Sequence, residues 1–286
     1  MADKPQTAQG YPPEQIERVR STCLTIAVAL GDMREDVVVV GGFAPMLLVP
    51  QDPAPGGVLR HVGTLDLDLG LDVAILDDHR YAAITARLRD AGFSPDLTVE
   101  GRATRQRWRS RAAGGTTATV DFLIPPSRPG DRGGTIRNIE GDFAALVTPD
   151  LQLAFRDRLS VSVAGVTADG AMAERMVQVC GPGAYIVLKA LAFDGRGAPK
   201  DAYDLFYVVR NYGSGVEEVA RHLARLQSEP EAAIAISVLR RDFCEPAAAG
   251  PSRVARFMTN GLDPGTQADV AGNIRQLLRL AEGEVV

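Results

Sequence analysis

The stretch GTLDLDLGL, residues 63–71, alternates between two kinds of side chain. Leucine occupies every odd position from 65 onward, whereas Thr64, Asp66 and Asp68 lie between the leucines. Successive side chains of a β-strand point to opposite faces, so this stretch predicts a strand with one apolar and one acidic face. Aspartate is disfavoured in strands, and two aspartates at alternating positions therefore need a reason.

Metal binding is one such reason. Residues two apart on a strand lie roughly 6.5–7 Å apart along the chain, and two carboxylates this close repel each other unless a cation lies between them. Mg²⁺ prefers oxygen ligands, commonly one or two carboxylates together with substrate phosphates. Asp66 and Asp68 therefore predict a site for Mg²⁺, or Mn²⁺, facing a triphosphate. The alternative is a half-exposed strand whose acidic face is simply solvated.

A third aspartate strengthens the metal hypothesis. Asp121 lies in ATVDFLI (118–124), another strand-like run. If the two strands are neighbours, three carboxylates converge, as two-metal phosphoryl transfer requires. Asp121 could otherwise be an edge-strand residue or a salt-bridge partner. Gly41 and Gly42 follow a predicted buried strand of four valines, and glycines there let backbone N–H groups approach an anion, although most such glycines only make a turn.

Arginines alternate along the run before Asp121, at positions 105, 107, 109 and 111, with Trp108 on the other face. This ribbon predicts either a solvated outer face or a contact with an RNA backbone or a triphosphate. If residue 111 pairs with 117, Arg107 opposes Asp121 and shares its face, but a one-residue slip would reverse the ribbon. His61, just before the aspartate strand, is interpreted as a loop histidine rather than a substrate contact.

Near residue 180 the sequence pattern changes from mixed strands and helices to helices alone. The first part combines helical patterns at 13–30 and 77–91 with strand-like runs at 37–40, 64–71, 103–111 and 117–124, a Pro/Gly-rich loop at 51–57, and two or three further short strands up to 179. Helical spacing then recurs at 184–194, 199–212, 216–227, 229–244 and 265–283. We therefore predict an α/β (α+β) fold: a mixed-sheet domain at residues 1–180, followed by a helical domain at residues 181–286.

Composition narrows the functional classes. The net charge of −5 gives no support for indiscriminate nucleic-acid binding. No apolar run approaches the roughly 20 residues that a membrane span needs, and the first ten residues lack the apolar core of a signal peptide. Cys23, Cys180 and Cys244 have no metal-ligand spacing and are expected to be buried thiols. These features predict a cytoplasmic protein.

Four segments together resemble a known family. They are VGGFA (40–44), GTLDLDL (63–69), TVDFL (119–123) and LKALAFDGRGAPKDAYDL (188–205). Their order is similar to the glycine turn, Asp-x-Asp strand and later single Asp of polymerase-β-like nucleotidyltransferases. The last segment resembles the Lys…Arg…Lys-Asp-x-x-Asp-Leu signature of the AbiEii/AbiGii toxin-type members. The resemblance extends from about residue 37 to 210.

The resemblance implies a role for each matching position. The catalytic positions are Asp66, Asp68, Asp121 and Asp204, of which the first three would hold the metal. The nucleotide-binding positions are Gly41, Gly42, Thr64 and Lys189. Because Phe43 stands where a hydroxyl residue is common in the superfamily, Thr64 would supply that contact. Without the resemblance, Lys200 and Asp204 would be an ordinary i, i+4 pair on a helix surface.

What the resemblance implies is a metal-dependent nucleotidyltransferase that transfers NMP from an NTP to an acceptor. It suggests tRNA or another RNA as acceptor, and a toxin–antitoxin or phage-defence role with a cognate antitoxin protein as partner. One alternative is a small-molecule, antibiotic-type nucleotidyltransferase, which a deep acidic acceptor pocket would favour. The other is a non-catalytic nucleotide-binding module, against which the intact set of three aspartates argues.

Overall fold

The computed structural model describes residues 5–51, 60–72, 78–112 and 115–283. The chain divides into two compact units, and each is described by itself. The sheet unit comprises Pro13–Leu47 and Gly63–Cys180. The helical unit comprises Met1–Pro12, Leu48–Val62 and Gly181–Val286. The loop predicted at 51–57 lies outside the described residues from 52 onward.

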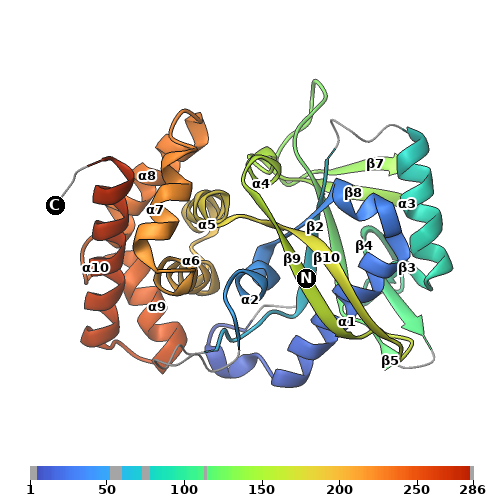
Figure 1. Cartoon of the computed structure of the whole chain (residues 1–286), viewed down its shortest axis with the longest axis horizontal. Coiled ribbons are helices and arrows are strands. Elements are labelled where there is room, and N and C mark those ends of the chain that lie inside the picture. The colour runs from blue at the N-terminus through green and yellow to red at the C-terminus, as the bar shows by residue number, and fades with distance from the viewer. Residues whose placement is uncertain (1–4, 52–59, 73–77, 113–114, 284–286) are drawn as a thin grey trace. The chain divides into compact units, whose positions relative to one another are not determined.

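A mixed sheet forms the centre of the sheet unit (Figure 1). Its main path runs β3-β4-β6-β2-β1-β10-β9. The strands are β1 (Val37–Val40), β2 (Asp66–Leu71), β3 (Phe93–Leu97), β4 (Ala103–Ala112), β6 (Thr119–Ile124), β9 (Arg158–Val166) and β10 (Met172–Cys180), with β5 (Gly115–Thr116), β7 (Ile136–Glu140) and β8 (Phe143–Val147) off this path. β2 pairs antiparallel with β1 and parallel with β6, so the predicted mixed sheet is confirmed.

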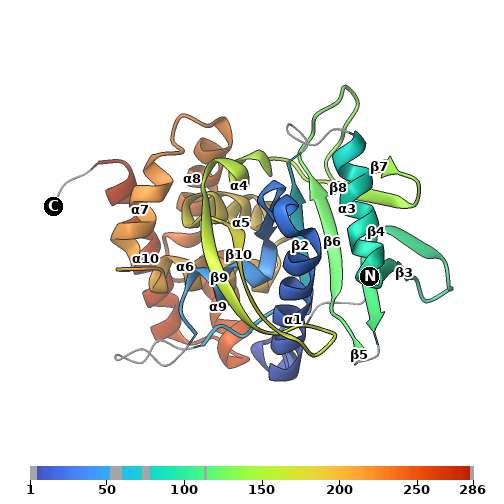
Figure 2. The same cartoon turned by 45° about the vertical axis from the view of Figure 1, so that its right-hand side comes forward.

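Helices cover one face of this sheet. α1 (Pro13–Leu30) and α3 (Asp78–Asp90) lie together in front of the strands in Figure 2. The odd-numbered leucines of β2 are buried, and Trp108 packs edge-on against Phe122 and Phe143 with ring centroids 6.3 and 5.5 Å away. Because side chains alternate along a strand, the aspartates of β2 emerge on the opposite face.

The acidic face is itself partly covered. α4 (Gln152–Arg156) lies near the far end of β2, where a Cβ added to Gly70 would be 3.4 Å from Phe155 and 3.5 Å from Leu151. α2 (Ala44–Leu48) follows the glycine turn after β1. The acidic face is therefore packed at its Gly70 end.

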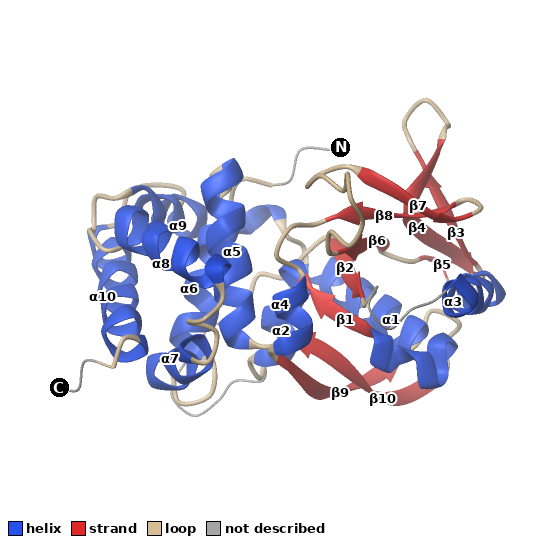
Figure 3. Cartoon of the chain, turned by 90° about the horizontal axis from the view of Figure 1, so that it is seen from above, coloured by secondary structure: helices blue, strands red, loops and turns tan. Residues whose placement is uncertain are grey.

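The helical unit contains α5 (Pro182–Arg196), α6 (Pro199–Asn211), α7 (Val216–Ala224), α8 (Pro230–Phe243), α9 (Ala249–Thr259) and α10 (Pro264–Ala281) (Figure 3). α5 packs against α6, α7 and α8. Gln51 and Val62 both contact α6: the Gln51 amide donates to the Tyr207 hydroxyl (3.3 Å), and the Val62 N–H donates to the Tyr203 hydroxyl (3.2 Å). His61 lies next to Val62 and therefore belongs to the helical unit.

Several local predictions need correction. β3 was not predicted, because FSPDL contains a proline and polar residues and lies at the sheet edge. α9 was missed because Gly250-Pro251 resembles a loop, although proline is tolerated in a first helical turn. Four strands, β7 to β10, follow β6 instead of two or three. Cys23 and Cys180 are buried, but Cys244 is partly exposed just after α8. Among the described helices none is both long and apolar enough to cross a membrane.

Candidate metal centre

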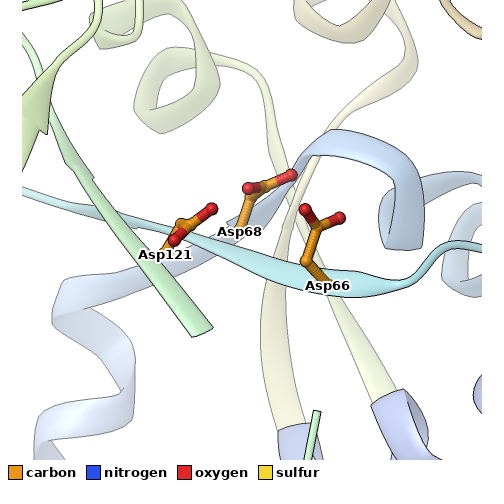
Figure 4. Close-up of side chains that lie close together, drawn as sticks. All are labelled: Asp66, Asp68 and Asp121. Atoms are coloured by element: carbon orange, nitrogen blue, oxygen red, sulfur yellow. The ribbon is translucent and has the colours of Figure 1, made fainter. Parts of the chain in front are cut away.

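Strand order brings the three predicted aspartates together. β2 and β6 are parallel neighbours, and Asp68 is directly opposite Asp121. Asp66 lies two residues before Asp68 and therefore shares its face. Figure 4 shows the three carboxylates gathered on one side of the strands, and each offers an oxygen within 4.8 Å of the others. The predicted convergence of the carboxylates is present; their binding of metal remains a prediction.

Asp66 is held in place by its neighbours along the chain. It is only 5% exposed, and its Oδ1 accepts a hydrogen bond from the Thr64 hydroxyl (3.1 Å). The Gln15 amide of α1 donates to the Leu65 carbonyl (2.8 Å), which anchors the start of β2. Thr64, predicted to contact nucleotide phosphates, thus orients a carboxylate of the centre in this structure.

Gly41 leaves room for Asp68. Its φ of +65° belongs to the left-handed region, and an added Cβ would lie 1.9 Å from an Asp68 carboxylate oxygen. No other residue type fits there without moving Asp68. Gly42 lies next to it in the same short 3₁₀ turn, Gly41–Phe43. The predicted contact of both glycines with phosphates stays a prediction.

Arg107 is the cation beside the centre. Its guanidinium donates two hydrogen bonds to Asp121, Nε to Oδ1 (2.7 Å) and Nη2 to Oδ2 (2.6 Å), and Nη2 lies 4.0 Å from Asp66. The hydrogen bonds that Arg107 donates to Asp121 raise the pKa of Arg107, so its side chain stays charged. Arg107 opposes Asp121, as in one of the two registers left open by the sequence, but residue 111 pairs with Thr116 rather than with residue 117.

Two other arginines of the predicted ribbon, Arg105 and Arg109, also have partners. Arg105 donates to the Asn138 side-chain oxygen (3.1 Å), and Arg109 forms an ion pair with Asp96 (3.4 Å). Trp108 is fully buried on the opposite face, as predicted. Arg105, Arg107 and Arg109 thus each have a partner, and Arg107 belongs to the carboxylate centre.

Chemically, the centre suits a hard divalent cation. All of its donors are carboxylate oxygens, which Mg²⁺ and Mn²⁺ prefer over softer ligands. Three carboxylates lie together here, and one guanidinium contacts them. A bound divalent ion would offset the charge of the carboxylates.

The helical unit carries a second charged cluster. The Lys189 ammonium of α5 donates to Asp201 (2.9 Å) and Asp204 (2.8 Å) of α6. Lys200 also donates to Asp204, and Arg196 makes a two-point contact with Asp201 (2.6 and 2.8 Å). Asp204 is fully buried, so the ordinary helix-surface pair considered from the sequence is wrong.

His61 completes this cluster. It lies in a loop, as predicted, but is buried, with its Nε2 2.9 Å from Asp204 Oδ1 and its ring stacked on Tyr203 at 5.2 Å. Burial, aided by the nearby Lys200, lowers the pKa of His61 to about 4. A neutral imidazole donates to an ionised carboxylate through a protonated Nε2. No local sequence pattern predicts this contact between residues 143 apart.

The cluster keeps its acids ionised. Burial alone would raise the pKa of Asp204, but Lys189 and Lys200 hold it well below its usual value. Burial alone would lower the pKa of Lys189, but Asp201 and Asp204 raise it above its usual value. Lys189 and Asp204, predicted to bind nucleotide and to act in catalysis, are therefore partners in one buried ion network.

Comparison with protein families identifies the family of this chain. A family model described as "Nucleotidyltransferase" matches residues 23–209, more than half of the chain. The chain therefore belongs to this nucleotidyltransferase family. A search of curated proteins finds no significant match. Among solved structures, an antigenic nucleotidyltransferase-like protein from Paracoccidioides brasiliensis is similar, with 18% identity, a TM-score of 0.39, and coverage of 77% of this chain and 93% of that one.

Proposed function

We propose that this protein is a metal-dependent nucleotidyltransferase that transfers NMP from an NTP to an acceptor. One observation carries the proposal: three aspartates from adjacent strands present oxygens within 4.8 Å of one another, in a chain of the nucleotidyltransferase family. When bound, a divalent ion would offset charge on the phosphates and align the attacking oxygen. The proposal includes a cytoplasmic location, where NTPs are abundant.

The residues of the sheet unit would act as follows. Asp66 and Asp68 hold the cation, and the Thr64 hydroxyl fixes the orientation of Asp66. The acceptor oxygen attacks the α-phosphorus, and the bond to the bridging oxygen breaks as pyrophosphate leaves. Asp121 takes the proton of the acceptor hydroxyl or binds the cation. The backbone of Gly41 and Gly42 faces the phosphates.

The roles of the helical unit and the acceptor rest on the resemblance of residues 188–205 to AbiEii/AbiGii toxin-type enzymes. By that resemblance Lys189 binds the triphosphate, Asp204 assists the transfer, and RNA, including tRNA, is the acceptor. A toxin–antitoxin or phage-defence role, with an antitoxin protein as partner, follows from the same resemblance.

The test offers each labelled NTP with Mg²⁺ or Mn²⁺ to the protein, together with total bacterial RNA or a panel of hydroxyl-bearing antibiotics. Metal-dependent label in RNA, absent with Asp66→Asn, would support transfer of NMP to RNA. Label in a small molecule would instead favour the antibiotic-type enzyme. NTP binding without transfer to any acceptor would favour a non-catalytic nucleotide-binding module.

A further inference from the structure

The register of the sheet sets Arg107 in line with the aspartates. Arg107 is directly opposite Asp121 across the antiparallel pair β4–β6, and Asp121 is directly opposite Asp68 across the parallel pair β6–β2. The three side chains thus form a row across adjacent strands. Cross-strand neighbours of this kind have Cβ atoms about 5 Å apart, so the contact is set by the fold as well as by side-chain rotamers.

Both carboxylate oxygens of Asp121 already contact this guanidinium. A divalent ion bound to a carboxylate oxygen lies about 2.1 Å from it. Since Nη2 of Arg107 is 2.6 Å from Asp121 Oδ2, an ion on that oxygen would lie within about 4.7 Å of a positive charge. A divalent ion and the guanidinium therefore compete for Asp121, whereas Asp66 makes only a 4.0 Å contact with Arg107.

We propose that Arg107 is a resident cation of the metal centre that occupies the place of a second divalent ion. The protein then binds one divalent ion tightly at Asp66 and Asp68, and a second ion binds weakly because it must displace Arg107 from Asp121. The inference rests on the proposed function, since it takes the three aspartates as a metal site. It adds a control on how many ions the centre holds.

Neighbouring arginines do not share this position. Arg105 and Arg109 lie on the same face of β4 but contact Asn138 and Asp96. The Arg107 side chain retains 24% of its exposure, so the guanidinium has a route to solvent when an ion displaces it. Arg105→Gln removes the same charge from the same strand face and is therefore the matched control for Arg107→Gln.

The experiment counts Mn²⁺ ions and measures their affinities by titration calorimetry and by the paramagnetic resonance of free Mn²⁺, without nucleotide. We expect Arg107→Gln to bind the second Mn²⁺ about tenfold or more tightly than the unchanged protein, because a nearby positive charge is removed and Asp121 is released. Arg105→Gln should bind Mn²⁺ as the unchanged protein does. The melting-temperature rise caused by Mn²⁺ should be largest for Arg107→Gln.

Two variants separate the possible failures. If Arg107→Gln binds Mn²⁺ no more tightly than Arg105→Gln, while Asp66→Asn loses binding, Arg107 is not a competing cation but the metal site stands. If Asp66→Asn binds Mn²⁺ as the unchanged protein does, the proposed function itself fails. Should Arg107→Gln not fold, Arg107→Lys decides: it keeps the charge but not the two-point contact, and should bind the second ion severalfold more tightly.

Discussion

Replacing Asp66 by Asn tests the centre most directly, because the change removes one charge and keeps the shape. In the unchanged protein the Thr64 hydroxyl donates to Asp66 Oδ1 (3.1 Å), and the side-chain oxygen of Asn can accept the same hydrogen bond. The variant should therefore fold. Transfer of nucleotide should fall about 10²–10³-fold, the usual cost of losing one catalytic electrostatic contact.

The metal-free variant should also be more stable than the unchanged protein. Asp66 has two carboxylates within 4.8 Å and one guanidinium at 4.0 Å. At an effective dielectric constant of about 20, unit charges 4 Å apart interact by about 4 kcal/mol. Two repulsions outweigh one attraction, so Asn removes a net repulsion of about 2–3 kcal/mol. This corresponds to a rise in melting temperature of about 5 °C.

Thermal unfolding in EDTA and in saturating Mn²⁺ measures this. In EDTA the variant should melt higher than the unchanged protein. In Mn²⁺ the unchanged protein should gain about 2–3 kcal/mol through binding at about 100 times its dissociation constant, and the variant should gain much less. Asp72→Asn, at the end of the same strand, should keep the metal response. An Asp66→Asn protein that melts lower in EDTA, or responds fully to Mn²⁺, would refute the reasoning.

Three further perturbations probe the surroundings. Gly41→Ala should destabilise the protein more than Gly31→Ala does, and it should also abolish the rise in melting temperature caused by Mn²⁺. Both glycines have a positive φ (+65° and +59°), which costs an alanine about 1–2 kcal/mol. Only at Gly41 would the added Cβ also meet an aspartate. Burial lowers the pKa of His61 to about 4, so the unfolded chain binds more protons than the folded chain between about pH 6.5 and pH 4. The free energy of unfolding should therefore fall by about 2 kcal/mol from pH 7 to pH 5. Urea unfolding of His61→Gln should lack this part of the loss. Lys189→Met leaves the buried aspartates without one of their cations and should lower the free energy of unfolding, measured in urea, by about 3 kcal/mol. The Arg196 side chain is 65% exposed, so Arg196→Met should lower it by less than about 1 kcal/mol. Equal losses for Lys189→Met and Arg196→Met would contradict the buried network.

The sequence predicts the centre because its signal is local. The alternation over residues 64–71 predicts a strand, puts both aspartates on one face of it, and sets the distance between them. A run of valines predicts the neighbouring buried strand. Asp121 required one further step, since its strand must lie beside β2. That pairing is long-range, but aspartate in an otherwise apolar strand already marked the residue as unusual.

Arg107 and His61 illustrate what local patterns leave open. A one-residue slip of β4 would place Arg107 on the other face, so its contact with Asp121 depends on a register that the sequence did not decide. His61 meets Asp204 across 143 residues, through a loop whose path no periodic pattern describes. Arg196 and Lys200 were part of the recognised segment, but burial of Asp204 turns a surface pair into a network.

The two clusters differ in their unbalanced charge, and this difference bears on the proposed substrate. In the sheet unit, three aspartates against Arg107 leave two negative charges, which favour a divalent cation. In the helical unit, two aspartates contact three cations, and His61 is neutral. The cations are Lys189, Arg196 and Lys200, so one positive charge is left, which favours an anion. A complex of a divalent ion with a nucleoside triphosphate carries both kinds of charge. Considered by itself, the sheet unit would repel a free nucleotide that carries no metal, so its negative charge favours the metal complex of the nucleotide.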